Sequence, residues 1–437
     1  MWYKESVFYQ IYPLGLCGAP RENDGQVVSR IMQLLDWLPH LQKMNINGVI
    51  FNPLFDSDRH GYDTRNFNKL DPRLGTNEDL KTICKTYNDA GLALMFDGVF
   101  NHVGRGFWAF QDVIENKESS RYKDWFHIHF GGNTHFNDGF HYDNWEGHYE
   151  LVKLNLNNPE LVDYLLQQVT HWVTEYGIKG LRLDVAYMVD RNFLRRLHDH
   201  CLSLDPEFFL LGEMIHGDYR QIVNGEMCHS ATNYECAKGL VSALNSHNLF
   251  EVAHSLQRQF GQEQWALYRD LPLLSFVDNH DLSRAATAIQ DKRCLPLAYA
   301  IIFTMPGLPC IYYGSEWGIE GSVQHDDADV RQSIRQPEWN ELTELIAQLA
   351  DIRRRYPVLA RGAFRNVLIQ NKQLIFERKD GEQRIMTAVN MDDQPATLHF
   401  DAGCGRAREL ITDTDHDFGA GSELEPFAYK VWLMETN

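Results

Sequence analysis

The apolar positions along the chain follow two alternating patterns. Short runs rich in β-branched and aromatic residues are each followed by a longer segment in which apolar residues recur at helical spacing. This alternation predicts an α/β fold of repeated βα units, and eight such runs fit a closed (β/α)8 TIM barrel better than an open sheet. The expected strands are Val7–Tyr12, Gly48–Pro53, Ala93–Phe100, Gly180–Ala186, Phe208–Glu213, a weak one near Tyr234, Leu274–Val277 and Cys310–Tyr313. The expected helices are Val27–Met44, Asn77–Ala90, Pro159–Tyr176, Arg191–Leu202, Pro296–Phe303 and Trp339–Tyr356.

Two stretches interrupt this rhythm. Residues 103–153, after the third predicted strand, are rich in Gly, Asn, His and aromatic residues. Connections of this length inside a compact fold are usually functional or separately folded, so we expect a small inserted domain. Residues 358–437 show short alternating runs separated by Gly and Asp turns, which predicts a C-terminal antiparallel β-sandwich domain. The barrel would then comprise residues 1–102 and 154–357.

Polar residues gather where the predicted strands end. In a parallel barrel the carboxyl ends of the strands converge on one face, so these side chains are expected to share one site. The residues concerned are Asp97, Asn101 and His102 after the third strand, Arg182 and Asp184 in the fourth, Glu213 at the end of the fifth, and Asp278, His280 and Asp281 after the seventh.

This combination suits the hydrolysis of a glycosidic bond. The reaction needs one carboxyl group to protonate the leaving oxygen and a second to attack the sugar or to activate water, and Asp184 and Glu213 suit these roles. Because side chains alternate along a strand, Arg182 points to the same side as Asp184, and its charge is expected to keep Asp184 ionised. Glu213 lies near other carboxylates at the end of an apolar strand and is expected to stay partly protonated near neutral pH, as an acid must.

Each of these residues also has a structural interpretation. An aspartate at a strand end is often a helix cap or an ion-pair partner, and His102 and His280 could be buried structural histidines. Asp97 is expected to be structural, because it can pair with Arg182. Tyr62 could be simple packing. The histidines of the inserted segment are spaced too irregularly to predict a metal site.

Four motifs resemble the signature regions of the α-amylase family of glycoside hydrolases, family 13. They are DGVFNH (97–102), GLRLDVA (180–186), GEM (212–214) and FVDNHD (276–281), in the family's order, and the resemblance covers nearly the whole predicted barrel. It implies that Asp184 is the nucleophile, Glu213 the general acid/base and Asp281 the stabiliser of the transition state.

The resemblance also implies a set of substrate-binding residues. Arg182, His102 and His280 would bind the sugar, and Tyr62, within the GYD segment at 61–63, would stack against it at the cleavage site. Within the family, SRYKDWFHI (120–128) and LVKLN (151–155) look closest to cyclomaltodextrinases, neopullulanases and maltogenic amylases. Substrates in that subgroup are cyclodextrins, short maltodextrins and sometimes pullulan.

The chain departs from the family pattern in two places. Cyclomaltodextrinase-type enzymes usually begin with an additional β domain that helps them to dimerise, whereas here the predicted barrel starts within about ten residues, which leaves the oligomeric state open. Many secreted α-amylases have a Lys-His pair after the second motif, near a structural calcium, but this chain has Tyr187 and Met188. The inserted segment shows no clear carboxylate cluster, so we expect no required metal and no cofactor.

Composition and charge narrow the choice of partner and compartment. The chain has 41 Lys and Arg against 60 Asp and Glu, a net charge of −19, which disfavours nucleic acid as a partner. No stretch is long and apolar enough for a membrane span, and the N-terminus does not have the pattern of a secretory signal. The eight cysteines lie far apart, as expected for reduced thiols in a cytoplasmic protein.

The leading hypothesis is a retaining hydrolase of α-1,4 bonds in short linear or cyclic maltodextrins. Transglycosylation and cleavage of α-1,6 bonds remain open, because motifs do not specify the acceptor contacts. The competitor from another class is a catalytically silent barrel used for binding. Such a barrel should lack at least one of the three carboxylates named above, and all three are present.

Overall fold

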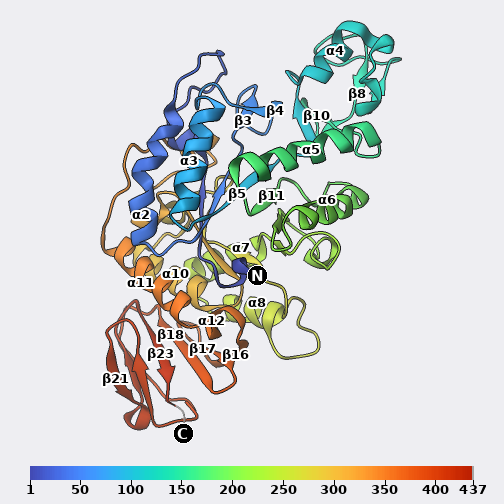
Figure 1. Ribbon diagram of the computed structural model, residues 1–437. Coiled ribbons are helices and arrows are strands. Elements are labelled where there is room, and N and C mark those ends of the chain that lie inside the picture. Colours follow the sequence, from blue (N-terminus) through green and yellow to red (C-terminus); the bar gives the residue numbers. More distant parts are fainter. Residues whose placement is uncertain (436–437) are drawn as a thin grey trace.

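The computed structural model describes residues 1–435, and its centre is a parallel barrel (Figure 1). Eight strands pair in parallel in the order β13-β12-β11-β5-β2-β1-β15-β14. A single parallel bridge from Thr232 to Leu274 joins the two end strands and closes the ring. The predicted (β/α)8 barrel is therefore confirmed. The strands are β1 (Phe8–Ile11), β2 (Gly48–Phe51), β5 (Ala93–Gly98), β11 (Gly180–Leu183), β12 (Phe209–Gly212), β13 (Ser230–Ala231), β14 (Leu274–Ser275) and β15 (Leu308–Tyr312).

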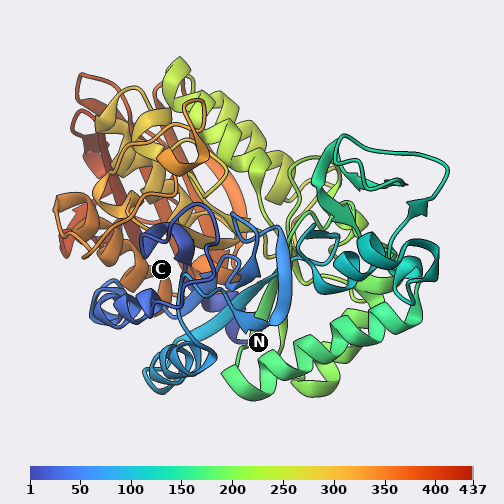
Figure 2. The same ribbon diagram turned by 90° about the horizontal axis from the view of Figure 1, so that it is seen from above.

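Helices surround this barrel (Figure 2). The longest, α5, coincides with the predicted range, and its first turn is capped by Asn158, whose side-chain oxygen accepts the Leu161 N–H at 3.1 Å. The helices are η2 (Arg30–Trp37), α2 (Leu38–Lys43), α3 (Asn77–Asp89), α5 (Pro159–Tyr176), α6 (Arg191–Leu204), α7 (Tyr234–Ser246), α8 (Phe250–Phe260), α10 (Leu295–Thr304) and α11 (Glu341–Arg355).

The helices differ from the expected ones in two places. The range 27–44 is not one helix, because the 3-10 helix η2 leads into a new α-helix, α2, with Pro39 in its first turn, where a missing N–H is tolerated. The weak strand expected near Tyr234 is present as β13, Ser230–Ala231, while Tyr234 itself begins α7, which the side chain of Asn233 caps. Helices α7 and α8 were not predicted, and Gly239 in the interior of α7 weakens its helical signal.

The segment between β5 and α5 folds beside the barrel mouth (Figures 1 and 2). It contains a three-stranded antiparallel sheet of β6 (His102–Gly104), β10 (His148–Lys153) and β9 (Asn144–Trp145), together with α4 (Trp108–Asn116) and a short pair of β7 (Ile128–His129) with β8 (His141–Tyr142). Because β6 begins directly after the third barrel strand, this sheet is tied to the end of the barrel where the predicted site lies.

The C-terminal part is an antiparallel β domain below the opposite end of the barrel (Figure 1). Its main sheet has six strands in the order β16-β17-β18-β23-β20-β21, and β19 (Ala396–Leu398) pairs separately with β22 (Ser422–Leu424). Leu398, Leu424 and Trp432 share a buried cluster between these strands. The main strands are β16 (Ala363–Ile369), β17 (Gln373–Asp380), β18 (Gln383–Asn390), β20 (Arg406–Glu409), β21 (Thr414–Asp417) and β23 (Ala428–Met434).

A buried arginine joins this domain to the barrel. Arg378 on β17 donates to the carbonyl of Thr304, the last residue of α10, at 3.1 Å, and to that of Gly362 at 2.8 Å. Its guanidinium is 1% exposed and lies at the negative end of the α10 dipole. The contact makes the C-terminal domain part of the support of the barrel.

Candidate active site

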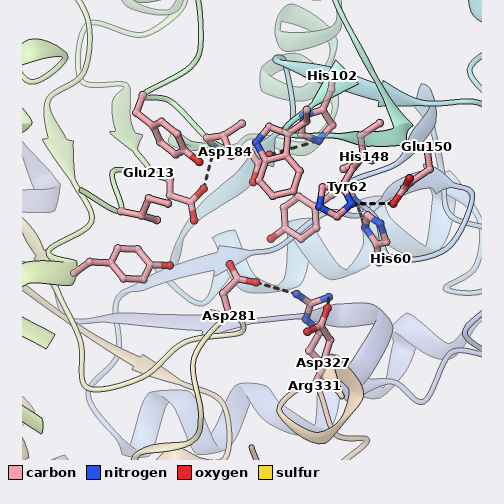
Figure 3. A pocket seen from close by; sticks show the side chains of 16 residues that line it. His60, Tyr62, His102, His148, Glu150, Asp184, Glu213, Asp281, Asp327 and Arg331 are labelled. Atoms are coloured by element: carbon pink, nitrogen blue, oxygen red, sulfur yellow. Dashed lines mark hydrogen bonds and ion pairs between the residues drawn. The ribbon is translucent and has the colours of Figure 1, made fainter. Parts of the chain in front are cut away.

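A cavity of about 570 Å³ opens at the carboxyl ends of the barrel strands (Figure 3). Five of the seven predicted site residues line it, namely Tyr62, His102, Asp184, Glu213 and Asp281. The other two, Arg182 and His280, are 3% and 1% exposed and lie beneath the cavity floor. The size falls in the range of roughly 300–1,000 Å³ that is usual for small-molecule sites.

Arg182 is the centre of the buried charge network. Its Nη1 donates to both carboxylate oxygens of Asp97, at 2.9 and 2.7 Å, and to Oδ1 of Asp184 at 3.1 Å. Its Nη2 donates to Oε1 of Glu213 at 2.5 Å. The strand alternation that predicts Arg182 and Asp184 on one side is confirmed, and so is the pairing of Asp97 with Arg182. One guanidinium thus serves three carboxylates.

Burial and the charge of Arg182 act in opposite directions on the pKa values of the two central carboxyl groups. Burial raises the pKa of Asp184 well above its ordinary value, and the charge of Arg182 does not offset the effect of burial and of the neighbouring carboxylates. Burial also raises the pKa of Glu213, although Arg182 and the Val185 N–H favour its ionised form. The upward direction of the Glu213 shift agrees with its expected role as an acid. The expectation that the charge of Arg182 prevails at Asp184 is wrong, because burial, together with Glu213 and Asp97, outweighs it and raises the Asp184 pKa.

The ring of Tyr62, which lines the cavity, stacks on the ring of His280 beneath the floor. Their rings are nearly parallel, with centroids 5.6 Å apart and an angle of 12°, and the Tyr62 hydroxyl lies 2.5 Å from Nε2 of His280. The same hydroxyl donates to Oδ2 of Asp97 at 3.1 Å. Gly61 precedes Tyr62 with a φ of 90°, and an added Cβ would lie 2.8 Å from Pro53, so the turn that presents the ring requires glycine.

Asp281 faces the cavity and contacts both His280 and Arg331. Its Oδ2 lies 3.0 Å from Nε2 of His280, and its Oδ1 accepts from Nη2 of Arg331 at 2.9 Å (Figure 3). Burial opposes ionisation of Asp281, but His280 and Arg331 outweigh it and hold the pKa of Asp281 below its usual value. Asp281 is therefore held in its ionised form, whereas the pKa values of Asp184 and Glu213 are shifted upward.

His102 is a neutral donor or acceptor beside Asp184. Burial, with a smaller effect of His60, lowers the pKa of His102 to about 3. Its Nε2 lies 3.8 Å from Oδ2 of Asp184 and has no hydrogen-bond partner within residues 1–435. That nitrogen is available to a ligand in the cavity.

Sequence reasoning missed several residues of the cavity wall. The inserted segment contributes Trp145, His148, Glu150 and Leu151, and the indole of Trp145 stacks on the His148 ring at 5.2 Å. Aromatic and histidine enrichment of the insert was visible in the sequence, but no periodicity showed which rings face the barrel. The remaining wall residues are His60, Val185, Tyr187, Ile215, Tyr234, Asp327 and Arg331.

Neither a cluster of metal ligands nor a membrane-spanning helix occurs in residues 1–435. Across residues 1–435, no group of three or more His, Cys, Asp or Glu side chains is arranged to hold a metal ion. No helix in that range combines the length and apolar character that a membrane span needs.

Known proteins share both the sequence and the fold of this chain. Residues 10–357 match the family model described as alpha amylase, catalytic domain. The cyclomaltodextrinase of Geobacillus thermopakistaniensis is 30% identical, over 100% of this chain and 78% of that protein, and the maltogenic alpha-amylase of Bacillus acidopullulyticus is 29% identical, over 99% and 78%. A solved structure of a cyclomaltodextrinase, 28% identical, superimposes with a TM-score of 0.87 and covers 99% of this chain and 78% of that one. The resemblance drawn from the four motifs is confirmed, and the chain belongs to the alpha-amylase family of glycoside hydrolases.

Proposed function

We propose that the protein is a retaining hydrolase of α-1,4-glucosidic bonds in short linear or cyclic maltodextrins. The observation that carries this proposal is that Asp184 and Glu213 bind one guanidinium at the mouth of the barrel, with the ionised Asp281 across the same cavity. Because a single group contacts both carboxyls, they lie close together, which favours the separation of about 5–5.5 Å used by retaining enzymes over the wider one of inverting enzymes. The relatives named cyclomaltodextrinase and maltogenic alpha-amylase support this substrate class.

In the first step, Oδ of Asp184 attacks the anomeric carbon while Glu213 gives its proton to the leaving glycosidic oxygen. The C–O bond of the substrate breaks as the bond to Asp184 forms, and the product is a glucosyl ester with inverted configuration. In the second step, ionised Glu213 takes a proton from water, and the water oxygen attacks the anomeric carbon and releases Asp184. Two inversions give an α-configured product.

The other residues act on the same sugar. Tyr62 lines the cavity, and its ring is suited to pack against the apolar face of a pyranose. His102, neutral and with a free Nε2, can bond a sugar hydroxyl, while Arg182 and His280 hold the reacting carboxylates and Tyr62 from below. Asp281, kept ionised, suits the stabilisation of positive charge that develops in an oxocarbenium-like transition state.

The raised pKa values of Asp184 and Glu213 mean that the pair readily holds a proton, which the reaction needs on Glu213. A sugar in the cavity brings a hydroxyl to Asp184, and this new donor favours the ionised form of Asp184. The proton then belongs on Glu213. Substrate binding itself would thus prepare the acid and the nucleophile.

For cellular location we propose the cytoplasm. The eight cysteines are unpaired thiols, seven of them buried, which suits a reducing compartment. One relative, the intracellular maltogenic amylase of Bacillus subtilis, is 31% identical over 73% of this chain and 56% of that protein.

The test is product analysis by proton NMR and chromatography with β-cyclodextrin, maltoheptaose, pullulan and isomaltose. The proposal expects α-configured maltose or glucose first from the α-1,4 substrates, at a rate that Asp184→Asn lowers by at least about 10⁴. Asp163→Asn, a change in an exposed ion pair with Arg196, is the matched control and should leave the rate unchanged. Products longer than the substrate would indicate a transferase. Preferential cleavage of isomaltose would indicate an enzyme that acts on α-1,6 bonds, and no turnover of any substrate would indicate a catalytically silent barrel.

A further inference from the structure

Val185, the residue after Asp184, has an unusual backbone. Its φ is 40°, in the left-handed region that β-branched residues rarely adopt. Its side chain is 6% exposed and lines the catalytic cavity. A conformation of this kind persists only where the surrounding structure imposes it, and it is found most often at functional sites.

The chain is fixed on both sides of Val185. Before it, the Asp184 N–H donates to the Gly98 carbonyl at 3.1 Å, which extends the ladder between β11 and β5. After it, the Met188 N–H donates to the Val185 carbonyl at 2.8 Å and closes a turn that leaves the barrel. The left-handed residue therefore lies at the point where the strand becomes a turn.

The conformation aims the Val185 N–H at the general acid. This N–H donates to Oε2 of Glu213 at 2.9 Å, while Oε1 of Glu213 accepts from Arg182 at 2.5 Å. Both oxygens of the carboxyl group are thus held by donors, and the Glu213 backbone N–H is held by the Leu183 carbonyl at 2.9 Å. The protein itself therefore orients the Glu213 side chain.

We propose that Val185 is a positioning residue whose strained backbone presents an N–H to Glu213, orienting this acid/base and stabilising its carboxylate after it has donated its proton. The inference rests on the proposed role of Glu213. In the first step Glu213 loses a proton, and the negative charge that remains is shared by the Arg182 guanidinium and this N–H. In the second step the same carboxylate takes a proton from water, and the N–H keeps it in place.

The donor can be removed alone by replacing Val185 with its α-hydroxy analogue, which puts an ester oxygen where the N–H stands and keeps the side chain. The carboxylate then loses a donor, so the alkaline limb of the kcat/KM profile should move up by about one pH unit. We expect kcat to fall about tenfold, because the orientation of Glu213 is lost. KM should stay within about twofold of the wild-type value, because the cavity wall is unchanged. The same replacement at Val162 on α5, whose N–H donates to the Asn158 carbonyl at 3.1 Å, is the matched control and should leave the limb in place. If the protein with an ester bond at position 185 keeps the wild-type alkaline limb of the kcat/KM profile and the wild-type kcat, the proposal is overturned.

A second pair of variants tests the strain. Alanine is normally more stable than glycine in folded proteins, but only glycine adopts a positive φ freely. Val185→Gly should therefore have a higher melting temperature than Val185→Ala, and both, which retain the N–H, should keep the wild-type alkaline limb. The opposite order of stability, or a limb that moves in the alanine variant, would contradict the proposal.

Failure of this inference is distinct from failure of the proposed function. If Glu213→Gln remains fully active, the role of Glu213 is wrong and Val185 has no acid to position. If Glu213→Gln is inactive while the ester at 185 behaves as wild type, only the role of Val185 is wrong.

Discussion

Replacing Arg182 by methionine removes the one cation that three buried carboxylates share. Arg182, Asp184 and Glu213 are 3%, 6% and 4% exposed. Solvent therefore has little access to the carboxylates if the guanidinium is removed. Breaking a buried ion pair by removing one partner costs roughly 3–5 kcal/mol. We expect Arg182→Met to lower the free energy of unfolding by about that amount at pH 7.5.

The loss should depend on pH in a defined direction. Without Arg182, the pKa values of Asp184 and Glu213, already raised by burial, rise further in the folded state. A carboxyl group whose folded pKa lies above its unfolded value destabilises the fold at higher pH, and this penalty disappears as pH falls toward the unfolded value of about 4. The difference from wild type should therefore shrink by at least about 1.4 kcal/mol, the equivalent of one pKa unit on one group, between pH 7.5 and pH 5.0.

Urea unfolding followed by tryptophan fluorescence at the two pH values measures both effects. The control is Arg196→Met, because Arg196 pairs with Asp163 at 2.8 Å on the surface, with side chains 47% and 63% exposed. That variant should stay within about 1 kcal/mol of wild type at either pH. A loss below 1 kcal/mol for Arg182→Met, or one equal at both pH values, would refute this account of the charge network.

Three further outcomes are expected. Tyr62→Ala should raise KM for maltoheptaose at least about tenfold in steady-state assays. Tyr62→Phe should raise KM less, because it keeps the ring and loses only the hydroxyl bonded to Asp97. Equal increases in KM for the two variants would contradict stacking of the ring on the sugar. The alkaline limb of kcat/KM should lie above the ordinary glutamate value of about 4.3, because burial raises the pKa of Glu213 and the acid must be protonated; a limb at or below about 4.3 would contradict this. Arg378→Met should lower the free energy of unfolding by roughly 2 kcal/mol or more, because the buried carbonyls of Thr304 and Gly362 lose their hydrogen-bond donor. Scanning fluorimetry measures this, and an unchanged melting temperature would refute the role of the contact.

Much of the barrel and of its site could be predicted because strand ends carry a simple geometric rule. The period-2 alternation places Arg182 and Asp184 on one side, and convergence of parallel strands brings Asp97 and Glu213 to them. These relations depend on backbone geometry alone. The motifs then identified the family correctly.

The sequence does not contain the distances that decide competition for one partner. It could not show how fully Asp184 is buried, nor that Asp97 takes two bonds of Arg182 and leaves Asp184 with one, so the direction of the Asp184 pKa shift was predicted wrongly. It also gave no sign of which insert side chains turn inward, so Trp145 was missed, since irregular loops lack a repeating period.

The central claim is that Asp184 becomes covalently bound to the sugar, and mass spectrometry of the trapped intermediate tests it most directly. Glu213→Gln would be incubated with α-maltosyl fluoride, whose fluoride leaves without help from an acid, while the second step lacks its base. The account predicts a mass increase of one maltosyl group on the peptide that contains Asp184, and none when Asp184→Asn is added to the same variant. A maltosyl group on any other residue, or rapid turnover with β-configured maltose and no adduct, would contradict the account.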